Sequence, residues 1–305
     1  MRVLVTGATG FIGAAVAREL VGRGHEVHAL VEPSASTARI DDLRGRVTLH
    51  EANLHDAERV DAACAAAAAE TCLHLAWYAL PSDYLHSEEN VALIGASVGL
   101  FRAFAKAGGK RFVGTGTCIE YDTSHGLLRE GHTPILPRTL YAVCKNALHG
   151  ALVELGPRYD VTVAWMRFFF VYGPGEAPGR LVSDVLGKLS RGERAPCSSG
   201  AQIRDFLHVS DMARAVVLVA ESGADGAINV ASGVPVAVRD VLDAIGRVTA
   251  RPELLDIGAF APRPNDPPFI CADTTRLRGL GFAPRHSLES GLADTLDALR
   301  RDRVS

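Results

Sequence analysis

The sequence lacks the features that would place the chain in a membrane, on a nucleic acid or around a metal ion. No apolar run reaches the length of a membrane-spanning helix, and the apolar segment that follows Met1-Arg2 is too short for a signal peptide. The formal net charge is −3, and no cluster of basic residues of the kind that binds nucleic acid is present. The histidines show no HExxH or comparable ligand spacing, so we expect no metal.

The cysteines also lack a framework. Six are present among 305 residues, without a CxxC pair, which favours reduced thiols in the cytoplasm over a disulfide scaffold. Apolar residues make up 48% of the chain, and a chain of this length forms one large domain or two unequal ones. We therefore expect a globular, cytoplasmic protein.

Short apolar segments alternate with amphipathic ones through the first half of the chain. This alternation predicts an α/β fold, a doubly wound parallel sheet of the Rossmann type with helices on both faces. The expected strands are 2–6, 26–31, 46–50, 71–75, 110–115 and 161–167. The expected helices are 11–23, 56–69, 88–107 and 138–155.

The regular alternation ends at Tyr172-Gly173-Pro174-Gly175. We therefore predict a dinucleotide-binding domain over 1–171 and a smaller substrate-binding cap over most of 172–305. The two are expected to interleave, because Ile228-Asn229-Val230 reads as a further strand of the main sheet, returning near 226–231.

A glycine-rich loop follows the first expected strand directly. Gly7 allows a tight turn, Gly10 lets backbone N–H groups approach a pyrophosphate, and Gly13 allows close packing of the helix on the strand. The positive end of the following helix also favours an anion. A plain structural turn is the alternative, but the position between a strand and a helix favours a dinucleotide.

Glu32 lies 19 residues after Gly13, at the end of the second expected strand. A carboxylate there can accept hydrogen bonds from the adenosine ribose and would repel a 2′-phosphate, which favours NAD(H) over NADP(H). A solvated loop carboxylate explains Glu32 equally well. Arg39 is close enough in sequence to offset the repulsion, so NADP(H) stays open.

Tyr141 and Lys145 are four residues apart on an expected helix, and therefore lie on one face. A tyrosine has an ordinary pKa near ~10, and a neighbouring lysine cation is expected to lower it. Such a tyrosine can exchange a proton with a carbonyl or an alcohol oxygen while hydride moves. Many helices carry this spacing by chance, and the glycine-rich loop is what favours the catalytic interpretation.

Five segments taken together resemble the extended short-chain dehydrogenase/reductase family, in its NAD-dependent epimerase/dehydratase group. They are TGATGFIG at 6–13, HLAW at 74–77, YAVCK at 141–145, MRFFFVYGPG at 166–175 and RDFLHVSDMA at 204–213. The resemblance covers nearly the whole chain. It implies catalysis by Thr117, Tyr141 and Lys145. It implies cofactor contacts from Gly7, Gly10, Phe11, Ile12, Gly13, Asn53, Leu54, Leu75, Ala76, Tyr141 and Lys145. From its residues alone, Thr117 is equally a strand-end hydroxyl bonded to backbone.

Members of this family mostly act on sugars that carry a nucleoside diphosphate. The resemblance implies that Arg204 and Arg263 hold this diphosphate, with Arg180 a weaker candidate. A surface ion pair, for example between Arg204 and Asp205, is the alternative.

Departures from the family pattern separate its chemistries. Cys118-Ile119 follows Thr117 where the sugar 4,6-dehydratases carry Asp-Glu, and Phe170 stands where the 4-epimerases carry Asn. The apolar Phe170 favours a deoxysugar, although core packing is an equal explanation for the neighbouring Phe168. The resemblance therefore favours an NAD(P)H-dependent reductase of a nucleotide-linked 4-keto-6-deoxy sugar. A nucleotide-sugar 4-epimerase and a non-catalytic dinucleotide sensor are the alternatives.

The family commonly forms homodimers through two long helices, here 88–107 and 138–155. An apolar stripe of Val91, Ile94, Val98 and Phe101 fits such a contact. The same stripe fits packing against the sheet, and its spacing does not separate the two.

Overall fold

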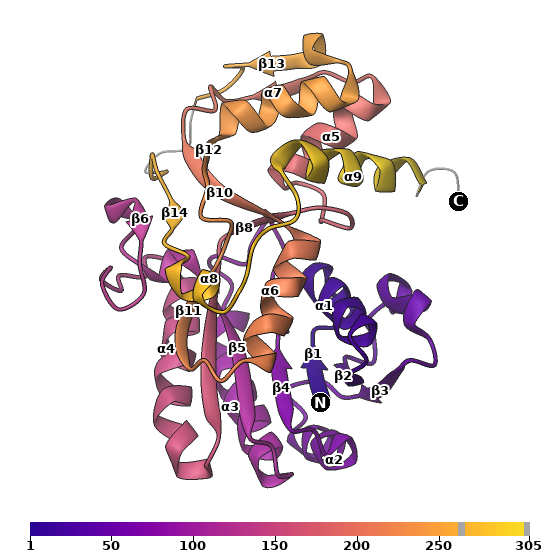
Figure 1. Cartoon of the computed structure of the whole chain (residues 1–305), viewed down its shortest axis with the longest axis vertical. Helices are drawn as coiled ribbons and strands as arrows, with labels where there is room; N and C mark the ends of the chain where they lie inside the picture. The colour runs from indigo at the N-terminus through magenta and orange to yellow at the C-terminus, as the bar shows by residue number, and fades with distance from the viewer. Residues whose placement is uncertain (262–265, 302–305) are drawn as a thin grey trace.

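A seven-stranded parallel sheet forms the centre of the computed structural model, which describes residues 1–261 and 266–301 (Figure 1). The strand order is β11-β7-β5-β4-β1-β2-β3, and every neighbouring pair is parallel. The order reverses at β1, as in doubly wound folds, which confirms the predicted fold class. The strands are β1 Arg2–Thr6, β2 Glu26–Val31, β3 Val47–Glu51, β4 Thr71–His74, β5 Arg111–Thr117, β7 Thr162–Phe168 and β11 Gly226–Val230.

Helices cover both faces of this sheet. α1 Phe11–Gly22 and α6 Val209–Glu221 pack together on one face. α2 Ala57–Ala67, α3 Glu89–Lys106 and α4 Leu140–Leu155 cover the other. The central strands are apolar toward both layers, as a sheet buried on two sides requires. Among the residues described, no helix combines the length and apolar character needed to cross a bilayer.

Helices of the C-terminal part of the chain pack around a separate apolar cluster. Its main helices are α5 Leu181–Arg191, α7 Val238–Thr249 and α9 Leu288–Arg301, which share one apolar cluster. Figure 1 shows them gathered at one end of the main sheet. The short strands are β6 Leu127–Leu128, β8 Phe170–Tyr172, β9 Ala195–Cys197, β10 Ile203–His208, β12 Pro235–Ala237, β13 Leu255–Ile257 and β14 Cys271–Ala272. The remaining elements are α8 Thr275–Gly279 and the 3₁₀ turns η1 Ala38–Leu43, η2 Cys118–Glu120, η3 Thr123–His125, η4 Gly156–Tyr159 and η5 Pro252–Leu254.

The expected elements of the first half form within a few residues of their predicted bounds. β11 lies beside β7 in the main sheet, at the place where a returning strand was expected. The division into a domain over 1–171 and a cap over 172–305 stays a prediction. The stripe on α3 does not form a single buried face, because Phe101 is in the core whereas Val91 is 54% exposed.

A chain of buried polar groups joins β5, β7 and β11 at their carboxyl ends. Glu120, which is fully buried, accepts hydrogen bonds from the backbone N–H of Thr117 at 2.9 Å and from Trp165 Nε1 at 3.2 Å. Arg167 Nε donates to the same carboxylate at 2.7 Å, and the two charges are shielded from water. Arg167 also donates to the hydroxyl of Tyr121 at 2.9 Å.

The chain continues into the segments that border the cap. The Tyr121 hydroxyl donates to Asn229 Oδ1 at 2.9 Å, and Asn229 Nδ2 donates to the carbonyl of Leu128 at 2.9 Å. The Asn229 backbone N–H donates to Glu130 Oε1 at 2.6 Å. The end of β5 is thereby held in register with β7 and β11 by groups that each have a partner, as buried polar atoms require.

Glu120→Gln should destabilise the protein strongly, because it leaves the Arg167 guanidinium buried without a counter-charge. Removal of one partner of a buried pair costs about 3–5 kcal/mol. The measurement is the free energy of unfolding from urea denaturation. Glu89→Gln is the matched control, since Glu89 pairs with His55 on the surface and should cost less than about 1 kcal/mol. Equal losses in the two variants would contradict the assigned role of the buried pair.

Candidate active site

The glycine-rich loop lies between β1 and the start of α1. Gly7 has a φ of 73°, which favours glycine, and Gly10 precedes the first residue of the helix. The N–H of Gly10 donates to the carbonyl of Gly7 at 3.0 Å, which closes the turn. The first N–H groups of α1 are thus presented at the carboxyl end of the sheet, where an anion is favoured.

Two of the glycines are required by space. A Cβ on Gly7 would lie 2.7 Å from the backbone nitrogen of Ala76, and a Cβ on Gly13 would overlap the carbonyl oxygen of Gly7. Leu75 and Ala76 run alongside, with Ala76 N–H donating to Thr6 Oγ1 at 3.2 Å. The loop, its helix and the 75–76 segment therefore meet as predicted for a dinucleotide cradle. Phe11 and Ile12, the first residues of α1, are half-buried.

The predicted cofactor contacts beyond the glycine-rich loop include Glu32, Asn53 and Leu54. Glu32 is exposed just after β2, and Asn53 Nδ2 donates to its carboxylate at 3.4 Å. Leu54 packs on the core under α2 and α3. Arg39 donates to the carbonyl of Gly175 at 3.2 Å, so its fork is turned toward that loop. The carboxylate of Glu32 therefore faces solvent beside an amide, which fits both a ribose contact and a solvated loop carboxylate.

Lys145 is buried beneath the predicted reaction centre. Its ammonium donates to the carbonyl of Thr115 at 2.8 Å and lies 3.8 Å from the ring centre of Trp77, a close cation–π contact. Burial lowers the pKa of Lys145 to about 7, although the Glu120 carboxylate acts in the opposite direction. The lysine therefore changes charge near neutral pH in the protein alone.

Tyr141 lies in the first turn of α4 and contacts an aromatic partner. Its backbone N–H donates to the carbonyl of Leu85 at 3.1 Å, and the ring of Tyr84 meets it edge-on with 5.1 Å between centres. The Arg180 guanidinium lies 5.0 Å from the ring centre of Tyr84. Tyr84 therefore contacts both Tyr141 and Arg180, so Arg180 is close to the predicted reaction centre.

The pKa of Tyr141 is raised, which is opposite to the direction expected from its lysine neighbour. Burial is the main cause, and the phenol of Tyr84 and the carboxylate of Glu120 act in the same direction. The Arg180 guanidinium acts in the opposite direction and lowers this pKa. The Lys145 ammonium is 6.0 Å from the Tyr141 ring centre and is itself partly neutral near pH 7. The phenol therefore keeps its proton at neutral pH.

Thr117 ends β5 and is buried. Its hydroxyl accepts a long hydrogen bond of 3.5 Å from the N–H of Ile119, as a cap on the η2 turn. The alternative interpretation of Thr117 required a hydrogen bond between its hydroxyl and the backbone. That bond is present, but at 3.5 Å it is weak. α4 packs on the same turn, which brings Tyr141 and Thr117 to one side of the sheet edge.

The predicted substrate residues are placed in two groups. Phe170 is half-buried, with its ring centre 5.9 Å from that of Phe206 and 5.5 Å from the guanidinium of Arg204. Arg180 lies with Tyr84 and Tyr141. Arg263 lies outside the described residues.

The suggested Arg204–Asp205 surface pair is wrong. Arg204 is buried and bonds Asp266 Oδ1 at 2.5 Å and the carbonyl of Pro267 at 2.8 Å. Asp205 instead accepts from Ser232 Oγ at 2.6 Å and the N–H of Gly233 at 2.9 Å. The two side chains have opposite directions because adjacent strand residues point to opposite faces.

Three residues at this site carried no assigned role in the sequence analysis. They are Trp77 over Lys145, Tyr84 against Tyr141, and Glu120 behind Thr117. Trp77 directly follows the 75–76 segment, and Glu120 lies three residues after Thr117. Their closeness in sequence to predicted site residues could therefore have indicated both. Tyr84 had none, because its contact depends on how 78–88 folds back onto α4.

Comparison with known proteins gives a family match over most of the chain. The model of the NAD dependent epimerase/dehydratase family matches residues 3–231, from β1 through β11. The fold and the cradle thus define a dinucleotide-dependent enzyme of the Rossmann class. The chain belongs to the NAD dependent epimerase/dehydratase family.

Relatives of several activities resemble the chain over most of its length. UDP-glucose 4-epimerase of Bacillus subtilis is 28% identical, over 97% of this chain and 96% of its own. The dTDP-6-deoxy-L-talose 4-dehydrogenase (NAD(+)) of Aggregatibacter actinomycetemcomitans is 25% identical, over 80% and 88%. UDP-glucose 4-epimerase of Thermus thermophilus, solved in complex with NAD, is 25% identical with a TM-score of 0.86, over 98% and 99%. The expected cofactor, NAD(H), is supported, and a preference over NADP(H) stays a prediction.

Tyr141→Phe should lower kcat by roughly 10²–10⁴ while leaving the Kd of the dinucleotide nearly unchanged, because only the proton donor is lost. Steady-state turnover and fluorescence titration of the cofactor measure the two effects. Tyr159→Phe is the control, since that tyrosine is 41% exposed. Near-normal turnover in Tyr141→Phe would remove this residue from catalysis.

Lys145→Met should flatten the rise in stability between pH 7 and 9. The folded pKa of Lys145, about 7, lies below its ordinary 10.5, so the unfolded chain binds the extra proton in this window. Stability of the wild type should therefore increase with pH by up to about 2–3 kcal/mol more than that of the variant. Urea unfolding at both pH values measures it. Lys106→Met, with its side chain 79% exposed, should match the wild type. Parallel profiles for wild type and Lys145→Met would contradict a depressed pKa.

Glu32→Arg should shift cofactor preference toward NADP, because it replaces a charge that repels the 2′-phosphate by one that attracts it. The ratio of the Kd values of NAD and NADP measures the shift. Glu70→Arg is the control, since Glu70 is also exposed but precedes β4, at the opposite end of the parallel sheet. An unchanged ratio in Glu32→Arg would show that Glu32 has no contact with the ribose.

Proposed function

We propose that the chain reduces the 4-keto group of a nucleoside-diphosphate-linked 4-keto-6-deoxy sugar. The observation that carries this proposal is the absence of a free acid or base behind Thr117 among the described residues. Glu120 is buried with its oxygens bonded to Thr117, Trp165 and Arg167. Burial raises the pKa of the Cys118 thiol to about 12, so it stays neutral. These residues therefore suit transfer of hydride to a carbonyl carbon with transfer of a proton to its oxygen. Elimination of water would require a further acid–base pair.

Each predicted site residue would have a separate role in this reaction. When bound, the nicotinamide dinucleotide supplies the hydride. The loop with Gly7, Gly10 and Gly13 would hold its pyrophosphate: Gly10 lets the backbone N–H groups approach it, while Gly7 allows the turn and Gly13 the close packing of α1. The protonated phenol of Tyr141 would donate to the ketone oxygen, and the Thr117 hydroxyl would hydrogen-bond to that oxygen.

Lys145 would contact the nicotinamide ribose and adjust Tyr141. In the protein alone, its ammonium is held by Thr115 and Trp77 on the sheet side of the site. A negatively charged neighbour would favour its cationic form, because opposite charge raises the pKa of an amine. We therefore propose that Lys145 takes its cationic form when the cofactor is bound.

The substrate side of the proposal rests on Phe170, Phe206 and Arg204. The two aromatic rings form an apolar wall, which suits a methyl group in place of a hydroxyl. The guanidinium of Arg204 lies against Phe170, and guanidinium forks pair well with phosphate oxygens. A deoxysugar and its diphosphate would then lie on adjacent surfaces.

A 4-epimerase is the second candidate, because UDP-glucose 4-epimerases are among the relatives that cover nearly the full chain. It would use Thr117 and Tyr141 in both directions and keep its dinucleotide bound. A non-catalytic sensor would not require both residues. A homodimer through α3 and α4 also stays a prediction, consistent with the exposure of Val91, Val143 and Val153 on these packed helices.

The test measures cofactor oxidation with a panel of nucleotide-linked 4-keto-6-deoxy sugars, with Tyr141→Phe as the inactive control. Stoichiometric NADH or NADPH consumption with one of them supports the reductase. Interconversion of an unoxidised nucleotide sugar with no net consumption would support the epimerase. Bound cofactor without turnover in either assay would support the sensor.

Arg204→Gln should raise KM for the nucleotide sugar by about ten- to a hundred-fold, since a charge-assisted contact is worth ~1.5–3 kcal/mol. Asp266→Asn is the matched variant, because it breaks the same ion pair from the other side and frees the guanidinium. It should leave KM unchanged or lower it. Parallel increases in both variants would show that the ion pair, and not a diphosphate contact, matters.

A further inference from the structure

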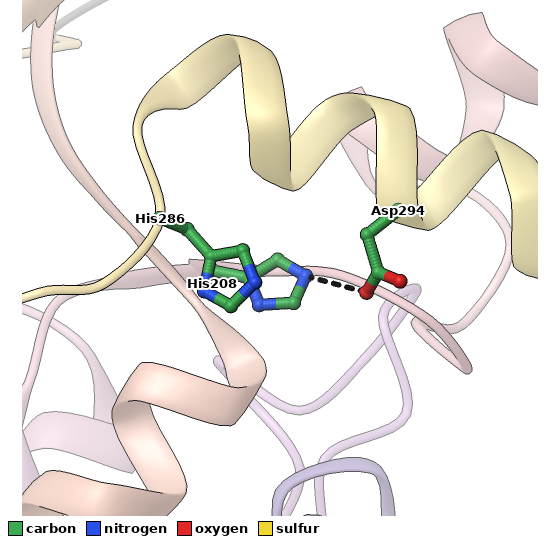
Figure 2. A group of neighbouring side chains, drawn as sticks. All are labelled: His208, His286 and Asp294. Atoms are coloured by element: carbon green, nitrogen blue, oxygen red, sulfur yellow. Dashed lines mark ion pairs between the residues drawn. The ribbon is translucent and has the colours of Figure 1, made fainter.

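Two histidines and an aspartate converge where the start of α6 meets α9. His208 is the residue before α6, His286 precedes α9, and Asp294 lies within α9. Figure 2 shows the imidazole of His286 lying over that of His208, with the carboxylate of Asp294 facing the His208 ring. One ligand atom from each residue lies within 4.8 Å of the other two.

His286 has one ring nitrogen bonded to a carboxylate, and its other ring nitrogen makes no hydrogen bond within residues 1–261 and 266–301. Its Nδ1 lies 3.0 Å from Asp211 Oδ2, and a carboxylate accepts the Nδ1 proton in this arrangement. Nε2 then carries a lone pair. A carboxylate behind a histidine in this way is the usual second-layer support of a metal-binding imidazole, because it fixes the tautomer and the ring direction.

His208 presents to Asp294 a ring nitrogen that makes no hydrogen bond within the described residues. The side chain is 2% exposed, and within the described part of the chain its Nε2 makes no hydrogen bond. Its Nδ1 lies 2.9 Å from Ser210 Oγ and accepts, at 3.4 Å, from the backbone N–H of Ser210, so without an ion the proton of the neutral ring is on Nε2. An ion at Nε2 would move this proton to Nδ1, where Ser210 Oγ can accept it. Burial, helped by His286, lowers the pKa of His208 to about 4, so the ring is neutral at physiological pH.

The carboxylate of Asp294 completes the group. It lies 3.4 Å from His208 Nε2, too poorly aligned for a hydrogen bond and close to the ~3.3 Å edge of a tetrahedron with bonds of about 2.0–2.1 Å. Its side chain is 46% exposed, which leaves an entry from solvent. Asp211, by contrast, already has its charge balanced by Arg214 at 2.7 Å.

We propose that His208, His286 and Asp294 form a binding site for a divalent transition-metal ion of the zinc class. Two imidazole nitrogens and one carboxylate oxygen are donors that zinc accepts, with a water in the fourth position. The ion would tie α9 to the start of α6. This site goes beyond the sequence analysis, which expected no metal because the ligands are separated by 78 and 8 residues.

The test titrates metal-free protein, prepared with a chelator, with Zn²⁺ by calorimetry, and with Co²⁺ to follow the absorption bands of tetrahedral coordination. We expect one site per chain and a rise in the thermal midpoint on addition of Zn²⁺. Asp294→Asn and His286→Gln should each weaken binding by more than the roughly 10- to 100-fold loss typical of an outer-layer partner.

The control variants make the same two kinds of substitution, Asp to Asn and His to Gln, at residues outside the proposed site. Asp297→Asn changes an exposed acid one turn along α9, and His55→Gln changes an exposed histidine paired with Glu89. Both should bind Zn²⁺ as the wild type does, and circular dichroism without metal shows whether each variant is folded. The proposal would be overturned if Asp294→Asn and His286→Gln bound Zn²⁺ as tightly as the control variants, or if the folded wild type did not bind Zn²⁺. In the latter case, His208 keeps its proton on Nε2 and pairs with Asp294 alone.

Discussion

The buried pair of Glu120 and Arg167 is the interaction on which the predicted reaction centre depends. A carboxylate that is fully removed from water is tolerated only with a counter-charge and complete hydrogen bonding, and Arg167, Trp165 and the Thr117 backbone together supply both. These partners come from β7 and from the end of β5. Satisfying one buried charge therefore fixes the relative positions of two strand ends, and with them the position of Thr117.

Burial also decides the protonation of the groups in front of this pair. Lys145 is enclosed by Trp77 and by β5, and it loses most of the hydration that stabilises an ammonium ion. Tyr141 keeps its proton because the phenolate would be equally poorly solvated and would face the field of Glu120. In the protein alone, the two residues are thus a protonated acid beside a lysine that titrates near neutrality, and not a preformed phenolate–ammonium pair. A proton donor is the state that reduction of a ketone needs.

The same edge of the sheet carries the connection to the C-terminal unit. Asp211, in the first turn of α6, accepts hydrogen bonds from the backbone N–H groups of Arg285 and His286 at 2.9 Å and from Arg214. The segment before α9 is therefore docked by a buried carboxylate, as the end of β5 is. Asp211 thereby ties this segment to α6, which packs on α1, the helix that begins at the glycine-rich loop.

By itself, the sequence determined the elements and the cofactor loop, because these depend on local physics. Apolar period, strand length and the three glycines specify β1, α1 and the turn between them, and the Cβ clashes at Gly7 and Gly13 explain why no other residue would serve. The spacing of Tyr141 and Lys145 also places them on one helix face. Tertiary structure alone decided the raised pKa of Tyr141, the contact of Tyr84 and the engagement of Arg204 by Asp266. These depend on burial and on segments far apart in the chain, and neither can be read from a linear pattern.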